Sequence, residues 1–210
     1  MRRIDKIRIR KDENKDMIGA DLKVTVRRRN GDTEIIYSGK SKSFVIAMLA
    51  HFKHMGKDYP NRATCCMKDW QGNSRYVDAN NHRFFNAYWH TEEGRWQWGI
   101  CFGSGFKGVE ASDYQLENHI RHGTSSGQLY YYAGTYSQVI IDGNTAYFTA
   151  TKSAENKHTD PITVREVAFM VRSRHDTSDY DFVIVRDRIS DVTLEQYDTI
   201  TVEYKFKVSA

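Results

Sequence analysis

Short runs of alternating apolar and polar residues fill the second half of this sequence and constrain its fold more than any other feature. The last run alternates five apolar residues with Thr, Glu and Lys: Ile200, Val202, Tyr204, Phe206 and Val208. Successive side chains of a strand point to opposite faces, so this run predicts one buried face and one charged face. Turn residues separate six such predicted strands, at 128–132, 136–141, 145–154, 162–172, 181–186 and 199–208. The expected fold is therefore mainly β, an antiparallel, jelly-roll-like β-sandwich.

The first half of the sequence adds a hairpin and a helix. Alternation over residues 22–27 leads into the turn pair Asn30-Gly31 and a second short run at 35–37, which predicts a β-hairpin. Six apolar residues then recur at helical spacing: Phe44, Val45, Met48, Leu49, Phe52 and Met55. They predict one amphipathic helix over about 43–56, with its apolar stripe against the core. Further strands are expected at 63–69 and 95–102.

Positive charge is concentrated at the N-terminus. The chain of 210 residues has a net charge of +4, but its first 29 residues contain eleven Lys and Arg against five Asp and Glu. We expect residues 1–16 to form an extended basic arm and residues 17–210 to form a single domain. The candidate partner-binding residues are seven arginines: Arg2, Arg3, Arg8, Arg10, Arg27, Arg28 and Arg29. Acidic residues are interspersed among them, and no aromatic residue occurs before Tyr37, so a specific nucleic-acid partner is not expected.

No apolar run approaches the ~18 residues that a membrane-spanning helix needs, and charge dominates the first eleven residues. We therefore expect a soluble protein that is made in a cytoplasm and has no membrane partner. The three cysteines, Cys65, Cys66 and Cys101, are an odd number and include an adjacent pair. They are expected to be reduced thiols, with one at most in the core.

The sequence offers little support for catalysis. His51 with His54, and His119 with His122, have a spacing that can bind a metal on a helix, but neither pair carries the Glu of a metalloprotease helix. The glycine-rich turn at 103–108 lacks the following helix and the Lys and Ser or Thr of a phosphate-binding loop. We predict no catalytic, cofactor-binding or metal-binding residues, and no enzyme activity.

Three tryptophans near the middle of the chain allow two interpretations. Trp89, Trp96 and Trp98 form a possible glycan-binding platform, or they cover the core. Trp96 and Trp98 share one face of a predicted strand, and aromatic pairs of that kind usually pack inward. Common solvent exposure of the three rings would favour the glycan-binding interpretation.

Three blocks of sequence together resemble a family of tailed-bacteriophage virion structural proteins. The first block is Ser-Lys-Ser-Phe-Val at 41–45, after the hairpin. The second is Gly-Ser-Gly at 103–105 with Asp-Tyr-Gln-Leu-Glu at 113–117, His-Gly at 122–123 and Gly-Gln-Leu-Tyr at 127–130. The third is Ile-Thr-Val-Arg-Glu-Val at 162–167, an Arg-Asp strand end at 185–187, and Ile-Thr-Val-Glu-Tyr at 200–204. The resemblance spans about residues 22–208, and Ala168, Phe169 and Ile200 depart from the Gly, Leu and Leu of the family pattern.

This resemblance implies a non-enzymatic structural component, present in multiple copies at the neck or tail of the particle, in the collar, connector or fibre-attachment region. A capsid decoration or head accessory protein is the alternative, and a glycan-binding adhesin module is a more distant one. The implied partners are other virion proteins and further copies of this chain in a symmetric ring, with no cofactor. The implied location is the virion, after synthesis in the host bacterial cytoplasm. The basic arm is expected to dock on an acidic surface of a neighbouring subunit.

Overall fold

A computed structural model describes residues 18–41, 43–44, 66–76, 92–175 and 178–209. These residues form twelve strands, and every pairing between strands is antiparallel. The strands are β1 (Ile18–Arg27), β2 (Thr33–Ser41), β3 (Cys66–Lys68), β4 (Ser74–Tyr76), β5 (Gly99–Gly103), β6 (Tyr130–Tyr131), β7 (Thr135–Tyr136), β8 (Ile140–Asp142), β9 (Thr145–Glu155), β10 (Ile162–His175), β11 (Ser178–Leu194) and β12 (Thr199–Ser209). The expectation of a mainly β, antiparallel protein is confirmed.

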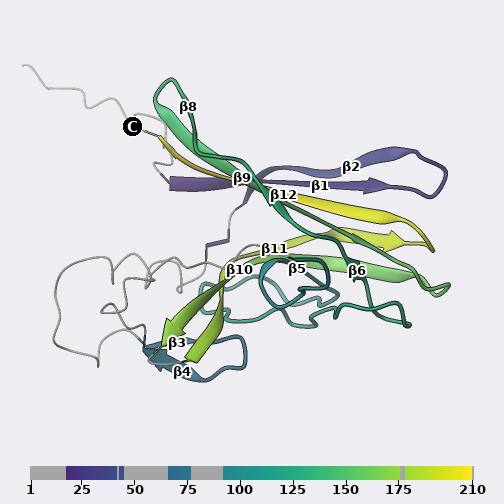
Figure 1. The fold of residues 1–210 in the computed structure, drawn as a ribbon, viewed down its shortest axis with the longest axis horizontal. Helices are drawn as coiled ribbons and strands as arrows, with labels where there is room; N and C mark the ends of the chain where they lie inside the picture. Colours follow the sequence, from purple (N-terminus) through teal and green to yellow (C-terminus); the bar gives the residue numbers. More distant parts are fainter. Residues whose placement is uncertain (1–17, 42, 45–65, 77–91, 176–177, 210) are drawn as a thin grey trace, which may run out of the picture.

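The strands are distributed over two principal sheets and one small hairpin. The larger sheet has the order β2-β1-β12-β9-β6, and β7 and β8 also pair with β9. The smaller sheet has the order β11-β10-β5, and β3 pairs with β4 alone. Figure 1 shows the larger sheet lying over the smaller one, with the β3–β4 hairpin at the lower left.

Both principal sheets contribute to one hydrophobic core. Alternate residues of β1 and β12 are buried, among them Val24 and Val202, and they belong to the same core cluster as Val167 and Phe169 of β10. The Phe169 ring lies 6.2 Å from that of Tyr204 and 4.9 Å from that of Phe206, centroid to centroid. The two sheets therefore pack against each other through their apolar faces.

The N-terminal hairpin and the alternation of the last strand are confirmed. β1 and β2 pair across the Asn30-Gly31 turn, where Gly31 has a φ of 94°. A φ in this range favours glycine, which explains the turn pair. On β12, Tyr204 is fully buried, but the inward face becomes exposed towards the strand end, where Val208 is 51% exposed.

Strand β11 is much longer than expected. The predicted strand covers 181–186, whereas β11 continues to Leu194. The Arg-Asp pair at 186–187, expected at a strand end, lies in the interior of β11. Charged residues obscured the continuation in the sequence: Arg186 and Asp187 are buried with polar partners, whereas Arg188 and Asp191 are exposed.

Some expectations concern residues that the structure does not describe. The basic arm, residues 1–16, lies outside the described residues. Of the helix expected over about 43–56, only Ser43 and Phe44 are described, and Phe44 forms an antiparallel bridge with Val185. The described residues contain no helix, and hence none long and apolar enough to cross a membrane.

Candidate functional site

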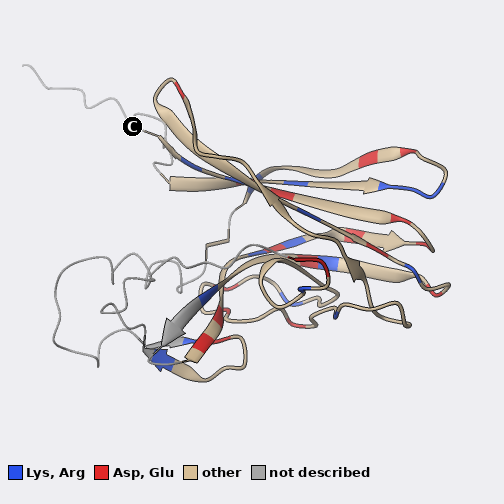
Figure 2. Cartoon of the chain, in the orientation of Figure 1, with Lys and Arg blue, Asp and Glu red and all other residues tan. Residues whose placement is uncertain are grey.

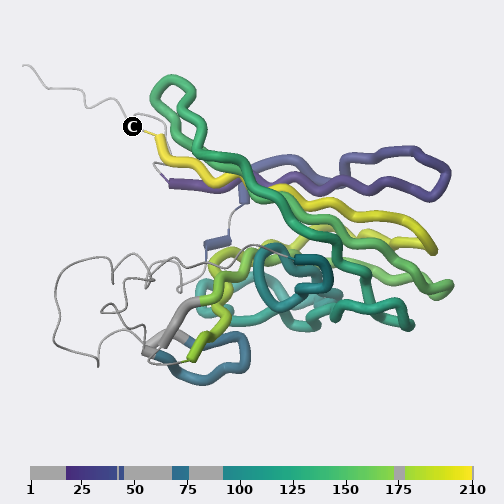
Figure 3. The backbone as a smooth tube through the Cα atoms, viewed as in Figure 1, coloured from purple at the N-terminus to yellow at the C-terminus, as the bar shows by residue number. Residues whose placement is uncertain are grey.

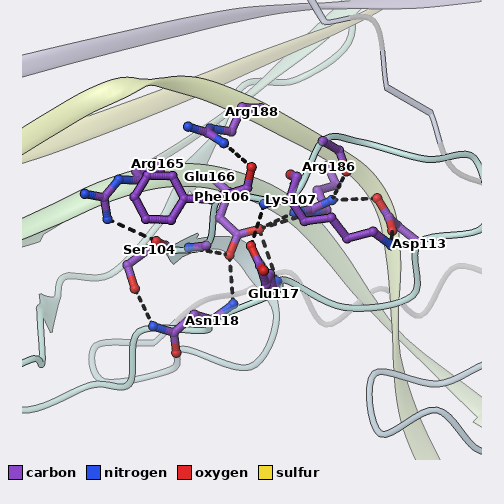
Figure 4. Close-up of polar contacts among 12 residues, drawn as sticks. Ser104, Phe106, Lys107, Asp113, Glu117, Asn118, Arg165, Glu166, Arg186 and Arg188 are labelled. Carbon is purple, nitrogen blue, oxygen red and sulfur yellow. Dashed lines mark hydrogen bonds and ion pairs between the residues drawn. The ribbon is translucent and has the colours of Figure 1, made fainter.

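A buried pair of opposite charges joins the smaller sheet to the loop that follows β5. Glu166 of β10 and Arg186 of β11 are 0% and 1% exposed. Glu166 lies opposite Arg188 in the antiparallel pairing. Arg186 precedes Arg188 by two residues, so it is the diagonal neighbour of Glu166 on the same face of the sheet. Nε and Nη2 of Arg186 donate to Oε2 of Glu166 over 2.9 and 2.7 Å, as Figure 4 shows. The pair forms a fork-shaped, charge-assisted contact.

The remaining N–H groups of Arg186 bind the loop. Nη1 donates to the Asp113 carboxylate over 2.6 Å and to the carbonyl of Gly108 over 3.2 Å. Nη2 also donates to the carbonyl of Lys107 over 3.1 Å. A guanidinium has five N–H groups, and all five have an acceptor here. Burial lowers the pKa of Arg186, but the hydrogen bonds to Glu166 and Asp113 outweigh burial and leave the pKa above its usual value.

The Glu166 carboxylate is equally well bonded on its other side. It accepts hydrogen bonds from the backbone N–H groups of Gly105, Glu117 and Asn118, over 3.0 to 3.2 Å. Figure 4 shows Glu117 and Asn118 of the loop beside the carboxylate. Glu166 and Arg186 therefore hold the two ends of the 104–118 loop against the sheet, and each is hydrogen-bonded from several sides.

The loop needs glycine where it approaches the carboxylate. A Cβ at Gly103 would lie 2.4 Å from Oε1 of Glu166, and a Cβ at Gly105 would lie 2.7 Å from the same atom. The glycine-rich turn that superficially suggests phosphate binding thus surrounds a carboxylate of its own chain. Backbone N–H groups suit either anion, which is why the sequence pattern is ambiguous.

The loop presents one exposed aromatic residue between two arginines. Phe106 is 62% exposed, and the guanidinium carbons of Arg165 and Arg188 lie 3.9 and 5.3 Å from the centroid of its ring. Arg165 is itself fixed by Asp191 over 3.0 Å and by the carbonyl of Ser104 over 3.2 Å, and Arg188 donates to the carbonyl of Phe106. These four side chains, Phe106, Arg165, Arg188 and Asp191, are called the Phe106 surface below.

A second buried polar contact connects the two principal sheets. Tyr204 Oη of β12 donates to Oδ2 of Asp187 over 3.0 Å, and Ser41 Oγ of β2 donates to the same oxygen over 2.7 Å. Burial, reinforced by the neighbouring Asp187, raises the pKa of Tyr204 well above its usual value. Glu166, Arg186, Asp187 and Tyr204 all lie in the third block of the family resemblance, so that block contributes much of the polar interior.

Sequence reasoning missed this interior network. Glu166 lies 20 residues from its partner Arg186, and Asp113, the second carboxylate bonded to Arg186, lies 73 residues from that arginine along the chain. The available signal was the Arg-Asp pair inside an otherwise apolar run, because a charge within such a strand needs a buried partner.

Of the three described candidate arginines, Arg28 and Arg29 line one open pocket together with Asn30, Glu195 and Asp198, and Arg27 is not part of that lining. Arg28 is committed to an internal ion pair, with its Nη1 at 2.8 Å from Oδ2 of Asp198. Burial raises the pKa of Asp198, but hydrogen bonds from Arg28 and the backbone of Arg29 outweigh burial and lower it. The Arg29 guanidinium lies 5.5 Å from the centroid of the Tyr197 ring, and Arg27 ends β1 with an exposed side chain. Arg2, Arg3, Arg8 and Arg10 lie outside the described residues.

The two described tryptophans of the possible glycan platform lie in different environments. Trp98 is 7% exposed, and the guanidinium carbon of Arg172 lies 3.4 Å from its ring centroid. Trp96 is half-buried and packs against Trp70 and His119 instead. Trp89 lies outside the described residues. The condition of common exposure is therefore not met by Trp96 and Trp98.

The histidines and cysteines also occupy different environments. His119 packs against Trp96, whereas Nδ1 of His122 accepts a hydrogen bond from the backbone N–H of Tyr131. His51 and His54 lie outside the described part of the chain, within which no group of three or more His, Cys, Asp or Glu is arranged to hold a metal. Cys101 is fully buried, and burial raises its pKa to about 12.

A comparison of this chain with protein-family models, with curated proteins and with solved structures finds no match.

Proposed function

We propose that this chain is a non-enzymatic structural component of a tailed-phage virion, assembling in multiple copies at the neck or tail. The three sequence blocks support the virion assignment. The observation that supports a binding role is the Phe106 surface, because an exposed ring stands on a loop that buried ion pairs hold in place. A preorganised loop loses little conformational freedom on binding, which favours association.

The bonding of the buried charges supports a scaffold more than a reaction centre. A general acid or base exchanges a proton with a substrate and has to reach it. Both Glu166 and Arg186 are enclosed, and each is hydrogen-bonded from several sides by groups of the chain itself. Their arrangement suits the fixing of one loop conformation.

The finer fold assignment belongs to this proposal. We infer a jelly-roll-like β-sandwich with an amphipathic helix over about 43–56. Its support is the common core of the two sheets and the pairing of the first strand with the last, from Ile18 opposite Val208 to Arg27 opposite Thr199. A compact β scaffold with loops at its ends suits repeated assembly on a symmetric particle.

The proposed partner of the Phe106 surface is a protein with an apolar pocket and an acidic rim. Aromatic residues and arginines carry a large share of the binding energy in protein interfaces. Phe106 supplies the apolar anchor, and Arg165 and Arg188 supply positive charge beside it. Along the described strands and loops, Figure 2 shows both signs of charge interspersed, which favours a protein over a nucleic acid as the partner.

Particles from the source that encodes this chain provide the test. The full-length protein is expected in purified particles, and the Phe106→Ala variant is expected to be incorporated at a strongly reduced level. Ile141→Ala is the matched control, because Ile141 is a 78% exposed apolar residue on β8 and not part of the Phe106 surface. Absence of the wild-type protein from purified particles would overturn the proposal. Equal incorporation of the Phe106→Ala and Ile141→Ala variants would show that the Phe106 surface is not the binding surface.

The basic arm receives its own experiment. Deletion of residues 2–16 is expected to leave the circular dichroism spectrum of the strands unchanged and to abolish incorporation into particles. Normal incorporation of the shortened chain would contradict a docking role for the arm. Imaging of labelled particles then distinguishes the neck or tail from the alternative location, the capsid surface.

A further inference from the structure

A small pocket with aromatic walls lies beside the 104–118 loop, apart from the Phe106 surface. Its volume is about 220 Å³, and Trp70, Trp96 and His119 form its aromatic walls. The Trp70 and Trp96 rings meet at 88° with their centroids 6.0 Å apart. His119 meets the ring of Trp96 at 4.8 Å and that of Trp70 at 6.2 Å. The three rings therefore form a corner rather than a flat stack.

The rim of this pocket is polar. Gln115, Asn118 and Arg121 line it with exposed side chains, and Leu116 and Met170 are its buried apolar members. The guanidinium carbon of Arg121 lies 5.7 Å from the centroid of the Trp96 ring. The pocket therefore combines aromatic rings with several hydrogen-bonding side chains, and polar atoms make up more of its exposed lining than apolar atoms do.

His119, one of the residues of the pocket wall, has a ring nitrogen without a partner. Nε2 of His119 is buried without a hydrogen bond to any part of the described chain. Burial lowers the pKa of His119 to about 4, against an opposing contribution from the backbone of Trp96, so the ring is neutral at pH 7. An unsatisfied buried polar atom is unfavourable, and this nitrogen gains a partner only if the His119 ring moves towards a ligand.

The chemistry of the walls selects the class of ligand. Arg121 and Glu117 are the charged residues of the lining, and their charges cancel, so neither an anion nor a cation is favoured overall. Perpendicular rings do not sandwich a flat base, but each can pack against the C–H groups of a non-planar ring. The volume lies below the ~300 Å³ at which sites for drug-sized ligands begin, so it suits one small ring.

We propose that the pocket formed by Trp70, Trp96 and His119 binds one neutral sugar residue of a glycan. The C–H face of the sugar packs on the Trp96 ring, and its hydroxyl groups bond to Gln115 and Asn118. This site differs from a Trp89, Trp96 and Trp98 platform, because Trp98 is buried and Trp70 takes its place. Binding of a sugar at this site does not require assembly through the Phe106 surface.

The test uses the full-length protein and four neutral monosaccharides: glucose, galactose, mannose and N-acetylglucosamine. Saturation-transfer NMR and tryptophan fluorescence are expected to show binding of at least one of them, and an array of neutral oligosaccharides then identifies the preferred glycan. Trp96→Ala is expected to weaken binding by about tenfold or more. Gln115→Ala is expected to weaken it by about fivefold, the value of one hydrogen bond.

Two controls keep the outcome decisive. Gln138→Ala removes the same type of exposed side chain outside the pocket and is expected to bind as the wild type does. Circular dichroism shows whether Trp96→Ala folds; if it does not, the exposed Gln115→Ala variant decides. No binding to any neutral sugar would overturn the proposal, as would binding that survives both substitutions or a preference for single-stranded oligonucleotides. None of these results bears on incorporation into particles.

Discussion

At the scale of single residues, Glu166 combines full burial with a dense set of hydrogen bonds. It receives two bonds from Arg186 and three from backbone N–H groups of the 104–118 loop. Taking a carboxylate and a guanidinium out of water is costly, and such bonds compensate only when they are complete. Removal of one partner therefore leaves the other charge buried without full compensation, which lowers the free energy of unfolding.

The Glu166→Gln variant is expected to lower the free energy of unfolding by about 3 kcal/mol, because Arg186 keeps its buried charge and retains only Asp113 as a carboxylate partner. Urea denaturation measures this change. Glu195→Gln is the matched control: its side chain is exposed, and it is expected to change the free energy by less than about 0.5 kcal/mol. Equal stability of the two variants would show that the network contributes little to folding.

Lys152 is the other unusual buried charge. It is 2% exposed on β9, its Nζ donates to the carbonyl of Arg95, and it lies 5.1 Å from the centroid of the Tyr131 ring. Burial lowers its pKa to about 8 from a usual value of 10.5. The neutral amine is therefore favoured by folding, and the protonated form is tolerated at a cost.

Stability is expected to depend on Lys152 above pH 8. Below pH 8 the folded and unfolded states are both protonated, and the cost of burying the charge is fully present. Between about pH 8 and 10.5 the folded state loses the proton while the unfolded state keeps it, so this residue makes the protein more stable as pH rises. The contribution amounts to about 3 kcal/mol over that interval.

The Lys152→Met variant isolates this contribution. Cys101, whose pKa is raised to about 12, works in the opposite direction above pH 9, so the quantity to measure is the difference between wild type and variant. Urea denaturation at a series of pH values is expected to show the wild type gaining stability relative to the variant from pH 8 upward. A constant difference across that range would contradict a lowered pKa for Lys152.

At the scale of elements, the β1–β2 hairpin depends on the backbone of one turn residue. Gly31 has a φ of 94°, and a Cβ there would meet no atom within 4 Å. Gly31→Ala is therefore expected to cost about 1 kcal/mol in unfolding free energy through backbone strain alone. Gly108→Ala is the control, because that position is equally open and has no positive φ. Thermal unfolding compares the two; equal melting temperatures would show that the turn tolerates a side chain.

Sequence periodicity predicted the strands whose two faces differ. β1, β9 and β12 pair as neighbours and alternate between buried and less buried positions, so their pattern is visible residue by residue. β11 was predicted too short because the charges in its second half resemble a surface segment. Whether such a charge is buried depends on partners far along the chain, such as Asp113 for Arg186. The candidate site was missed for the same reason, since no local pattern encodes a contact between distant segments.

At the scale of the whole molecule, the two principal sheets depend on each other. The Tyr204 ring packs against Phe169, and its hydroxyl bonds to Asp187, so a residue of β12 contacts both β10 and β11. Figure 3 shows the segment between β5 and β6 running beside the β10–β11 hairpin, where the Glu166 and Arg186 bonds hold it. Loss of either sheet would expose the apolar face of the other.

Unfolding of the full chain is therefore expected to be a single cooperative transition. Tryptophan fluorescence reports on the smaller sheet. Trp98 directly precedes β5, and the backbone N–H of Trp70 donates to the carbonyl of Asp181 on β11. Far-UV circular dichroism reports on all strands. The two urea transitions are expected to coincide. Separate midpoints would mean that the sheets unfold independently.

The loop around Gly103 and Gly105 binds an anion that is covalently attached to the same chain. Because Glu166 arrives with the sheet, its effective concentration at the loop is set by folding and does not vary with the surroundings. Dilution, added phosphate or a different cellular environment therefore does not displace the Glu166 carboxylate from the loop. The loop conformation that carries Phe106 is thus inherited from the fold itself, and every correctly folded copy presents it in the same way.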